Sequence, residues 1–283
     1  MNIIFSDLDG TLLHPQSYSF EAAEPALTAI RRGNTPLVLC TSKTRAEVEM
    51  WRERLKNDHP FIVENGGAIY IPAGYFPFAV PGAKQRDGYD VIEFGTPYLE
   101  LVLALREAAL ETGCEVLGFH QMSFADICLR TSLPVRQAAL AKQREFDEPF
   151  EILGSGTHTL LASIESRGKR WTRGDRFYHI TGANDKAAAV TSLMKLYRRA
   201  VGAVRTVGVG NGHNDAGFLL AVDVPVIIRS RFAVALKLAV PHAYVTSTPG
   251  PHGWNEAVLP VVALQKFPSG SGASETSPCR ASV

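Results

Sequence analysis

Apolar positions in the first 67 residues alternate between short unbroken runs and helical spacing. The run at residues 2–6 has the length and composition of a buried strand. From Phe20 to Arg32, apolar side chains recur every three or four positions, which predicts an amphipathic helix that Gly33 ends. The alternation then repeats with a strand at 37–40, a helix opened by the capping-box sequence Thr44–Glu47, and a strand at 61–63.

A different pattern occupies the middle of the chain. Residues 72–88 are rich in Gly, Pro and aromatic residues, and they are predicted to form a linker. Two helical patterns follow, at 98–112 and 134–146, between strand-like runs. The strand–helix alternation resumes at residue 185 with a helix and continues with a strand at 206–209.

These patterns predict an α/β protein with a Rossmann-like, mostly parallel sheet, because strands that alternate with helices form βαβ units. We expect a discontinuous core of residues 1–81 and 182–266, interrupted by an α+β insertion at 82–181. The segment 267–283 is dominated by Ser, Gly, Pro and Ala, and we expect it to be disordered. Ligands gather at the carboxyl ends of parallel strands, so the polar residues there are the first candidates for a site.

Composition narrows the classes of function. The 283 residues are 46% hydrophobic and 20% charged, with a net charge of +1. A nucleic-acid partner is not expected, because such proteins carry a strongly basic surface. The four cysteines are scattered and match neither a zinc site nor a disulfide framework. No apolar run is long enough for a signal peptide or a membrane span, so we expect a cytoplasmic protein without a membrane partner. The sequence carries no signal for an oligomeric state.

Two aspartates, Asp7 and Asp9, directly follow the first predicted strand. Residues two apart on a strand point to the same side, and Gly10 permits the sharp turn that follows, so both carboxylates can enter one site. One carboxylate can act as a nucleophile while the other carries a proton. Carboxylate oxygens also suit a hard cation such as Mg²⁺. A bare pair of this kind is more often a solvated turn, but this pair stands between a buried strand and Gly-Thr-Leu.

The segment Phe5–Leu12, with the sequence Phe-Ser-Asp-Leu-Asp-Gly-Thr-Leu, resembles the first motif of the haloacid dehalogenase superfamily of phosphatases. Three further motifs of that superfamily follow in the required order. They are Thr41 after the second strand, Lys186 at the start of a helix after the insertion, and the acidic loop Gly210–Asp215. The resemblance implies a haloacid dehalogenase-like core whose inserted cap domain closes over a substrate.

The resemblance also implies a role for each matched residue. Asp7 would be the nucleophile that forms an aspartyl-phosphate, Asp9 the general acid and base, and Lys186 the cation that neutralises nucleophile and phosphate. The candidate phosphate-binding residues are Thr41, Ser42 and Lys43. The candidate Mg²⁺ ligands are Asp7, Asp9, Asn211 and Asp215, and Asn214 is a candidate contact for the substrate.

One position departs from the superfamily pattern. Asn211 stands where the fourth motif normally has an aspartate that binds the metal directly. An amide oxygen can still coordinate Mg²⁺, but it lacks the charge of a carboxylate. We therefore expect weaker metal binding or greater reliance on Asp7 and Asp215, with impaired activity as one outcome.

Several stretches resemble the mannosyl-3-phosphoglycerate phosphatase family in particular: 40–47, 64–67, 140–149, 173–182 and 250–256. The resemblance implies a small-molecule sugar phosphate as substrate, mannosyl-3-phosphoglycerate, which would be hydrolysed to mannosylglycerate and phosphate. Such a substrate carries a carboxylate, which arginine binds well, so Arg144 and Arg173 are the main candidates for substrate binding. Gln143 and His179 are further candidates, for sugar hydroxyls.

Three alternatives remain open from the sequence. The first is another sugar-phosphate phosphatase, acting on glucosyl-3-phosphoglycerate, sucrose phosphate or a hexose phosphate. The second is a phosphomannomutase, which uses the same nucleophile. The third is a sugar-phosphate binding protein whose metal site is impaired by Asn211.

Overall fold

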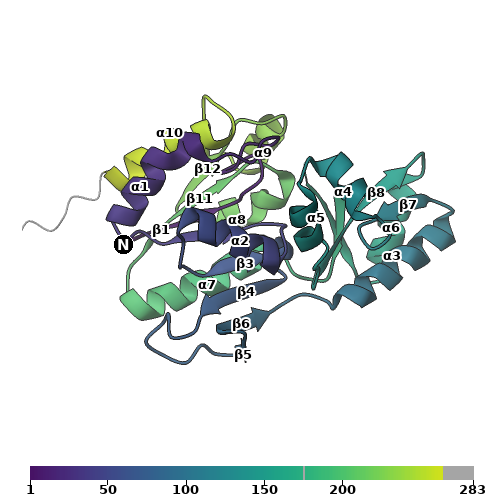
Figure 1. Cartoon of the computed structure of the whole chain (residues 1–283), viewed down its shortest axis with the longest axis horizontal. Coiled ribbons are helices and arrows are strands. Elements are labelled where there is room, and N and C mark those ends of the chain that lie inside the picture. Colours follow the sequence, from purple (N-terminus) through teal and green to yellow (C-terminus); the bar gives the residue numbers. More distant parts are fainter. Residues whose placement is uncertain (175, 264–283) are drawn as a thin grey trace, which may run out of the picture.

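The computed structural model describes residues 1–174 and 176–263. Its larger sheet has the strand order β13-β12-β11-β1-β2-β3-β4-β6-β5 (Figure 1). Strands β13 to β3 in this order are parallel, and β4, β6 and β5 extend the sheet in antiparallel fashion. The predicted α/β class with a mostly parallel sheet is therefore confirmed. The strands are β1 (Asn2–Ser6), β2 (Leu37–Cys40), β3 (Phe61–Val63), β4 (Ala68–Pro72), β5 (Lys84–Arg86), β6 (Tyr89–Glu93), β11 (Arg205–Gly210), β12 (Val224–Ile227) and β13 (Tyr244–Val245).

Helices cover both faces of this sheet. Successive strand residues point to opposite sides, so each strand contributes side chains to both helical layers. Ile4 of β1 packs into the cluster under α1 (Glu24–Arg32), α2 (Arg45–Leu55) and α10 (Gly250–Ala263). Its neighbours Ile3 and Phe5 pack into the cluster under α7 (Lys186–Val201), α8 (Ala216–Ala221) and α9 (Ala233–Ala239). The continuous apolar run of β1 is thus explained by burial on both faces.

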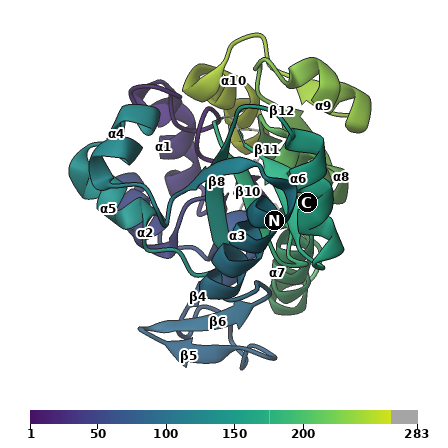
Figure 2. The same ribbon diagram turned by 90° about the vertical axis from the view of Figure 1, so that its right-hand side faces the viewer.

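A second sheet, with the order β7-β8-β10-β9, is antiparallel throughout. We call the elements from α3 to β10 the cap; they lie at one end of the core sheet and in front of it in the turned view (Figures 1 and 2). Leucines of α3 and α6 pack on the sheet in one cluster, and a smaller cluster lies under α4 and α5. The cap elements are α3 (Tyr98–Thr112), β7 (Glu115–Gly118), α4 (Phe124–Thr131), α5 (Val135–Ala141), β8 (Asp147–Leu153), α6 (Thr157–Ser166), β9 (Arg170–Arg173) and β10 (Tyr178–Thr181).

The boundary expected at residue 82 lies too early. Strands β5 and β6 fall inside the segment 82–181, but they pair with each other and β6 pairs with β4 of the core sheet. The turn between them is Asp87-Gly88, and both residues have positive φ, 52° and 81°. An Asp-Gly pair in such a turn favours a two-residue β-hairpin. This hairpin signal lies in the segment 72–88, which the sequence pattern predicts to be a linker. The segment 267–283, expected to be disordered, lies outside the described residues.

Contacts of residues 145 and 146, just before β8, help to hold the cap on the core. The backbone N–H groups of Glu145 and Phe146 donate to the buried Glu64 carboxylate, at 3.0 and 2.7 Å. The Phe146 side chain packs against Gly67 and Gly95, where an added Cβ would lie 2.4 and 2.5 Å from the Phe146 Cβ. Glycine is therefore required at both positions for this close approach. No helix within 1–174 or 176–263 is long and apolar enough to cross a membrane.

Candidate active site

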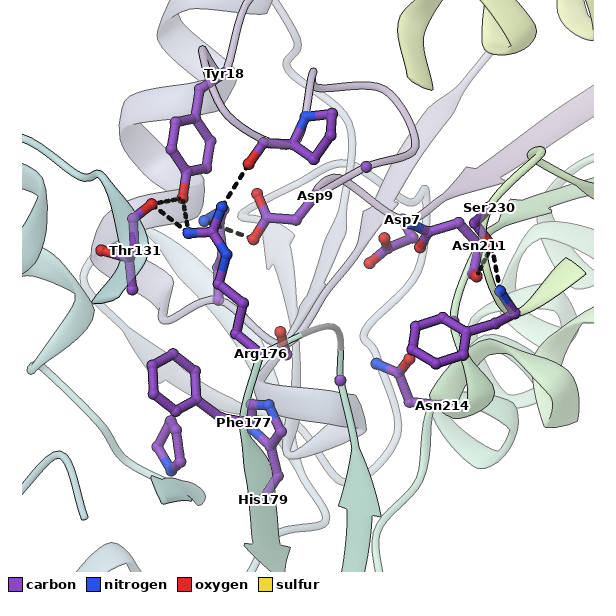
Figure 3. Close-up of a pocket in the computed structure, with 18 of the residues that line it drawn as sticks. Asp7, Asp9, Tyr18, Thr131, Arg176, Phe177, His179, Asn211, Asn214 and Ser230 are labelled. Atoms are coloured by element: carbon purple, nitrogen blue, oxygen red, sulfur yellow. Dashed lines mark hydrogen bonds and ion pairs between the residues drawn. The ribbon is translucent and has the colours of Figure 1, made fainter. Parts of the chain in front are cut away.

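A cavity of about 360 Å³ lies between the carboxyl ends of the core strands and the cap (Figure 3). Loops after β1, β2, β11 and β12 line it from the core, as expected for ligand sites of parallel sheets. The core lining includes Asp7, Asp9, Tyr18, Ser42, Lys43, Asn211, Asn214 and Ser230. The cap lining includes Phe119, Thr131, Arg144, Arg176, Phe177 and His179.

A buried ion pair joins Asp7 to Lys186. Lys186 Nζ lies 2.9 Å from Asp7 Oδ1 and 2.7 Å from Asp215 Oδ1, and the lysine is 1% exposed. Lys186 is the first residue of α7, whose N-cap is Asp185, so the helix start fixes its backbone. Burial raises the pKa of Asp7 to about 7, against the lowering effect of the Lys186 ammonium. Lys186 is therefore the group that favours the anionic form of Asp7.

A second ion pair joins Asp9 to Lys43. Lys43 Nζ lies 2.9 Å from Asp9 Oδ2, 3.3 Å from Glu47 Oε1 and 5.3 Å from the centre of the Tyr18 ring. Burial lowers the pKa of Lys43, but the two carboxylates outweigh that effect and hold it above its ordinary value. The other carboxylate oxygen of Asp9, Oδ1, is buried and has no hydrogen-bond partner in the described part of the chain.

The structure separates the three expected phosphate-binding residues. Ser42 and Lys43 line the cavity, whereas Thr41 is not among the described residues that do. The Thr41 hydroxyl is buried and accepts a hydrogen bond from the Lys43 N–H at 3.2 Å. Thr41 thus supports the turn that presents Lys43, and the Ser42 carbonyl accepts from Arg144 Nη1 at 2.7 Å.

Asp215 differs from the expectation that it binds the metal. Its Oδ2 accepts the backbone N–H groups of Asn211 and Gly212, both at 2.9 Å, and its Oδ1 accepts from Lys186. Oδ2 thus caps the tight turn after β11, while Oδ1 pairs with the Lys186 ammonium. Asp215 therefore shapes this loop and orients Lys186.

Asp7, Asp9 and Asn211 are the oxygen donors that remain at the cavity for a metal. Asp9 Oδ1 has no hydrogen-bond partner among the described residues. The Asn211 side chain packs against the loop after β1, where a Cβ at Gly10 would lie 2.4 Å from Asn211 Nδ2. Two carboxylates and an amide suit a hard divalent cation such as Mg²⁺. No group of three or more His, Cys, Asp or Glu within the described ranges is placed to hold a metal. The donor set thus fits Mg²⁺, with less negative charge than the expected motif supplies.

Two of the expected substrate-binding residues of the cap reach the cavity. Arg144 is nearly buried, with 5% of its side chain exposed, and it lies 3.8 Å from Asp147 and 3.9 Å from Glu47. His179 points into the cavity from β10, and its Nδ1 lies 2.8 Å from Asp147 Oδ1. Asn214 also lines the cavity, and its Nδ2 donates to Asn65 Oδ1 at 3.0 Å.

Gln143 and Arg173 are exposed and are not among the described residues that line the cavity. Arg173 lies over the Tyr178 ring, 5.0 Å from its centre, on the outer side of the β9–β10 pair. Arg176, three residues later, enters the cavity instead and donates to the Pro15 carbonyl at 2.6 Å and to the Tyr18 hydroxyl at 3.2 Å (Figure 3). The sequence offers no signal that distinguishes these two arginines, because the direction of each depends on the turn between the strands.

A basic segment after β12 was also missed. Arg229, Ser230, Arg231 and Phe232 line the cavity, and the Ser230 hydroxyl donates to the Asn211 carbonyl at 2.8 Å. Its position directly after a parallel strand was a usable signal, since polar residues there face the ligand edge of the sheet.

Comparisons with known proteins agree with this geometry. Residues 4–79 match the haloacid dehalogenase-like hydrolase family. A glucosyl-3-phosphoglycerate/mannosyl-3-phosphoglycerate phosphatase of Methanococcoides burtonii is 38% identical over 267 residues, which are 92% of this chain and 97% of that protein. A mannosyl-3-phosphoglycerate phosphatase of Pyrococcus furiosus is 40% identical over 228 residues, 81% of this chain and 91% of that protein.

The chain belongs to the haloacid dehalogenase-like phosphatases. It is of the type represented by these two relatives, and it is a phosphoric monoester hydrolase. The structure of a subclass IIB sugar phosphatase of the same superfamily has a TM-score of 0.62 at 16% identity, covering 92% of this chain and 98% of that one. This likeness shows a shared fold, including a cap over the core.

Proposed function

We propose that this haloacid dehalogenase-like phosphatase hydrolyses the phosphate monoester of a glycosyl-3-phosphoglycerate, with Asp7 as nucleophile. The observation that carries the proposal is the Lys186 ammonium held between Asp7 and Asp215, beside a cavity that Asp9 and Lys43 also enter. A buried cation in contact with a carboxylate nucleophile is suited to neutralising the charge of an incoming phosphoryl group.

In the first step, an Asp7 oxygen attacks phosphorus and the bond to the leaving alcohol oxygen breaks. Asp9 donates a proton to the leaving alcohol oxygen, and Asp7 becomes the aspartyl-phosphate. In the second step, Asp9 takes a proton from water, the water oxygen attacks phosphorus, and Asp7 leaves as a carboxylate. In the free protein Asp9 is paired with Lys43 at 2.9 Å. A phosphate that draws Lys43 away would let Asp9 take up the proton it must donate.

Mg²⁺ would be held by Asp7, Asp9 and Asn211, and when bound it would supply positive charge to the phosphate oxygens. Lys186 adds positive charge on the side of Asp7, and Ser42 and Lys43 hold the phosphate from the loop after β2. The cap closes the opposite side and excludes bulk solvent, while the water that Asp9 activates still reaches the aspartyl-phosphate.

The substrate class rests on charge around the cavity and on the names of the relatives. Lys43, Arg144, Arg176, Arg229 and Arg231 all line the cavity, which suits a ligand with a carboxylate as well as a phosphate. The cavity volume of about 360 Å³ is within the range of small-molecule sites. The relative from Methanococcoides burtonii is named for both glucosyl and mannosyl esters, so we propose a glycosyl-3-phosphoglycerate without choosing between the two sugars.

The proposal is tested by phosphate release from mannosyl- and glucosyl-3-phosphoglycerate, sucrose phosphate and hexose phosphates, each with and without Mg²⁺. We expect the highest kcat/KM for a glycosyl-3-phosphoglycerate and loss of activity when Mg²⁺ is chelated. Equal low activity on all esters would refute the substrate class. A product in which the phosphate has moved to another carbon of the sugar, without release of free phosphate, would indicate a mutase instead.

A further inference from the structure

A buried carboxylate and an imidazole form a pair on the cap side of the cavity. Asp147 is the first residue of β8, and His179 lies on the neighbouring strand β10. The two Asp147 oxygens lie 2.8 and 3.1 Å from His179 Nδ1. Asp147 is 0% exposed and His179 is 5% exposed. Figure 3 shows the His179 ring across the cavity from Tyr18 and Asp9.

The environment of Asp147 keeps it an acceptor. Asn65 Nδ2 donates to its Oδ2 at 2.6 Å, and the Arg144 guanidinium lies 3.8 Å from its Oδ1. Burial alone raises the pKa of Asp147, but His179, Arg144 and the Asn65 hydrogen bond outweigh it and hold that pKa below its ordinary value. An ionised Asp147 can only accept hydrogen bonds, so in the neutral ring the proton lies on Nδ1 of His179.

The second ring nitrogen of His179 has a different environment. Nε2 makes no hydrogen bond with any residue in the described part of the chain, and the ring lines the cavity. With the proton fixed on Nδ1, Nε2 of the neutral ring carries a lone pair. It can therefore accept a hydrogen bond from a ligand hydroxyl in the cavity.

Asn65 also connects this pair to the catalytic loop. Its Oδ1 accepts from Asn214 Nδ2 at 3.0 Å, while its Nδ2 donates to Asp147. Asn65 has a left-handed backbone, with φ of 55°, in the turn that also carries Glu64. Hydrogen bonds thus run from the loop after β11 through Asn65 and Asp147 to His179, and they fix the cap strand relative to the reacting end of the core.

We propose that Asp147 is a positioning residue that fixes the tautomer of His179, so that Nε2 accepts a hydrogen bond from a hydroxyl of the leaving group. The pair then favours polyhydroxylated esters over esters of simple alcohols and phenols. This inference rests on the proposed phosphatase function. It assigns recognition of the leaving group to Nε2 of His179, an atom that does not contact the phosphate.

The cap contains a matched control. Glu148, next in sequence, is also fully buried, and its Oε1 lies 2.6 Å from Nδ1 of His120. Neither Glu148 nor His120 is among the described residues that line the cavity. Glu148→Gln therefore disturbs another carboxylate–imidazole pair of the same strand, with a buried carboxylate, outside the cavity lining.

The test compares kcat/KM for a glycosyl-3-phosphoglycerate with kcat/KM for 4-nitrophenyl phosphate, whose leaving group has no further hydroxyl. In Asp147→Asn we expect the ratio of the two values to fall about tenfold, the effect of one lost hydrogen bond in a buried site. His179→Ala should lower the ratio similarly, and the double variant should fall no further, because Asp147 acts through His179. Glu148→Gln should leave the ratio unchanged. Additive losses, or an unchanged ratio in Asp147→Asn, would overturn the proposal.

The tautomer gives a second readout that does not depend on turnover. Two-bond ¹H–¹⁵N spectra of the wild-type protein at alkaline pH, where an imidazole is neutral, should show the His179 proton on Nδ1. In Asp147→Asn the amide can donate to Nδ1, so the proton should move to Nε2. A wild-type ring protonated on Nε2 would refute the proposal even if the variant fails to fold. Wild-type protein that hydrolyses neither ester would refute the phosphatase function itself, and this inference with it.

Discussion

The core and the cap contribute to the cavity in different ways. From the core come charged residues in contact with one another: Lys186 with Asp7 and Asp215, and Lys43 with Asp9 and Glu47. Each follows a strand or begins a helix, so its position is set within a few residues of sequence. From the cap come side chains whose direction depends on the antiparallel sheet and on its docking, such as His179 and Arg176.

The positions of the core residues therefore depend on local structure, whereas the positions of the cap residues depend on how the cap packs on the core. The core residues keep their geometry because each is held by hydrogen bonds within its own loop or to an adjacent strand. The cap residues face the cavity because contacts between core and cap, such as those of Glu64 with residues 145 and 146 and of Asn65 with Asp147, hold the two parts together. Substitutions in the core should therefore act on kcat, and substitutions in the cap on KM and substrate choice.

The largest expected effect is that of Asp7→Asn. Loss of the nucleophile should lower kcat by on the order of 10⁴-fold or more, since nothing else forms the aspartyl-phosphate. Steady-state phosphate release measures this, and rapid acid quenching with labelled substrate should find no phosphorylated protein. Asp58→Asn, the same change at an exposed site, serves as control. Substantial residual hydrolysis by Asp7→Asn would contradict the covalent mechanism.

A smaller loss is expected for Lys186→Met. Removing one charge that stabilises the phosphoryl group should lower kcat by on the order of 10²–10³-fold. It also leaves Asp7 and Asp215 buried without their partner, which should reduce the free energy of unfolding by about 3–5 kcal/mol. Urea denaturation measures the second effect. Lys195→Met, on the exposed side of the same helix, should change neither quantity, and a similar loss there would show that the helix rather than the charge matters.

The cap side of the comparison is tested by two neighbouring arginines. Arg176→Ala removes a cation that lines the cavity and contacts Pro15 and Tyr18 of the core, so KM for a glycosyl-3-phosphoglycerate should rise on the order of tenfold. Arg173→Ala removes an equal charge from the outer surface and should change KM less than about twofold. Equal effects of the two substitutions would show that only the overall charge of the cap matters.

A gain of similar size is expected at Asn211. Asn211→Asp adds a charged oxygen to the donors of Asp7 and Asp9, so Mg²⁺ should bind about tenfold more tightly, equivalent to about 1.4 kcal/mol. Calorimetric titration with Mg²⁺ measures this without turnover. Asn34→Asp adds the same charge at an exposed position and should leave the affinity unchanged. No gain in Asn211→Asp would indicate that the metal does not contact this side chain.

Part of the fold and part of the site could be predicted from the sequence. The strand–helix alternation predicted the parallel sheet, and the motif residues Asp7, Asp9, Lys43 and Lys186 do meet at its carboxyl edge. The hairpin of β5 and β6 was misplaced in the cap, although its Asp87-Gly88 turn was visible, because short exposed strands show little apolar pattern. Asp215 was assigned to the metal because its carboxylate is in the motif, while its hydrogen bonds to Asn211 and Gly212 exist only in the folded loop.

By itself the sequence predicted the fold class and the charged residues that meet at the carboxyl edge of the core sheet, because the order of strands and helix starts brings them together. Only the tertiary structure decided which cap residues line the cavity. Arg173 and Arg176 are equally basic and three residues apart, yet only Arg176 lines the cavity, because Arg173 lies against Tyr178 in the sheet whereas Arg176 contacts Pro15 and Tyr18 of the core. The pairing of Asp147 with His179, and its link through Asn65 to Asn214, likewise joins residues far apart in the chain that no local pattern brings together.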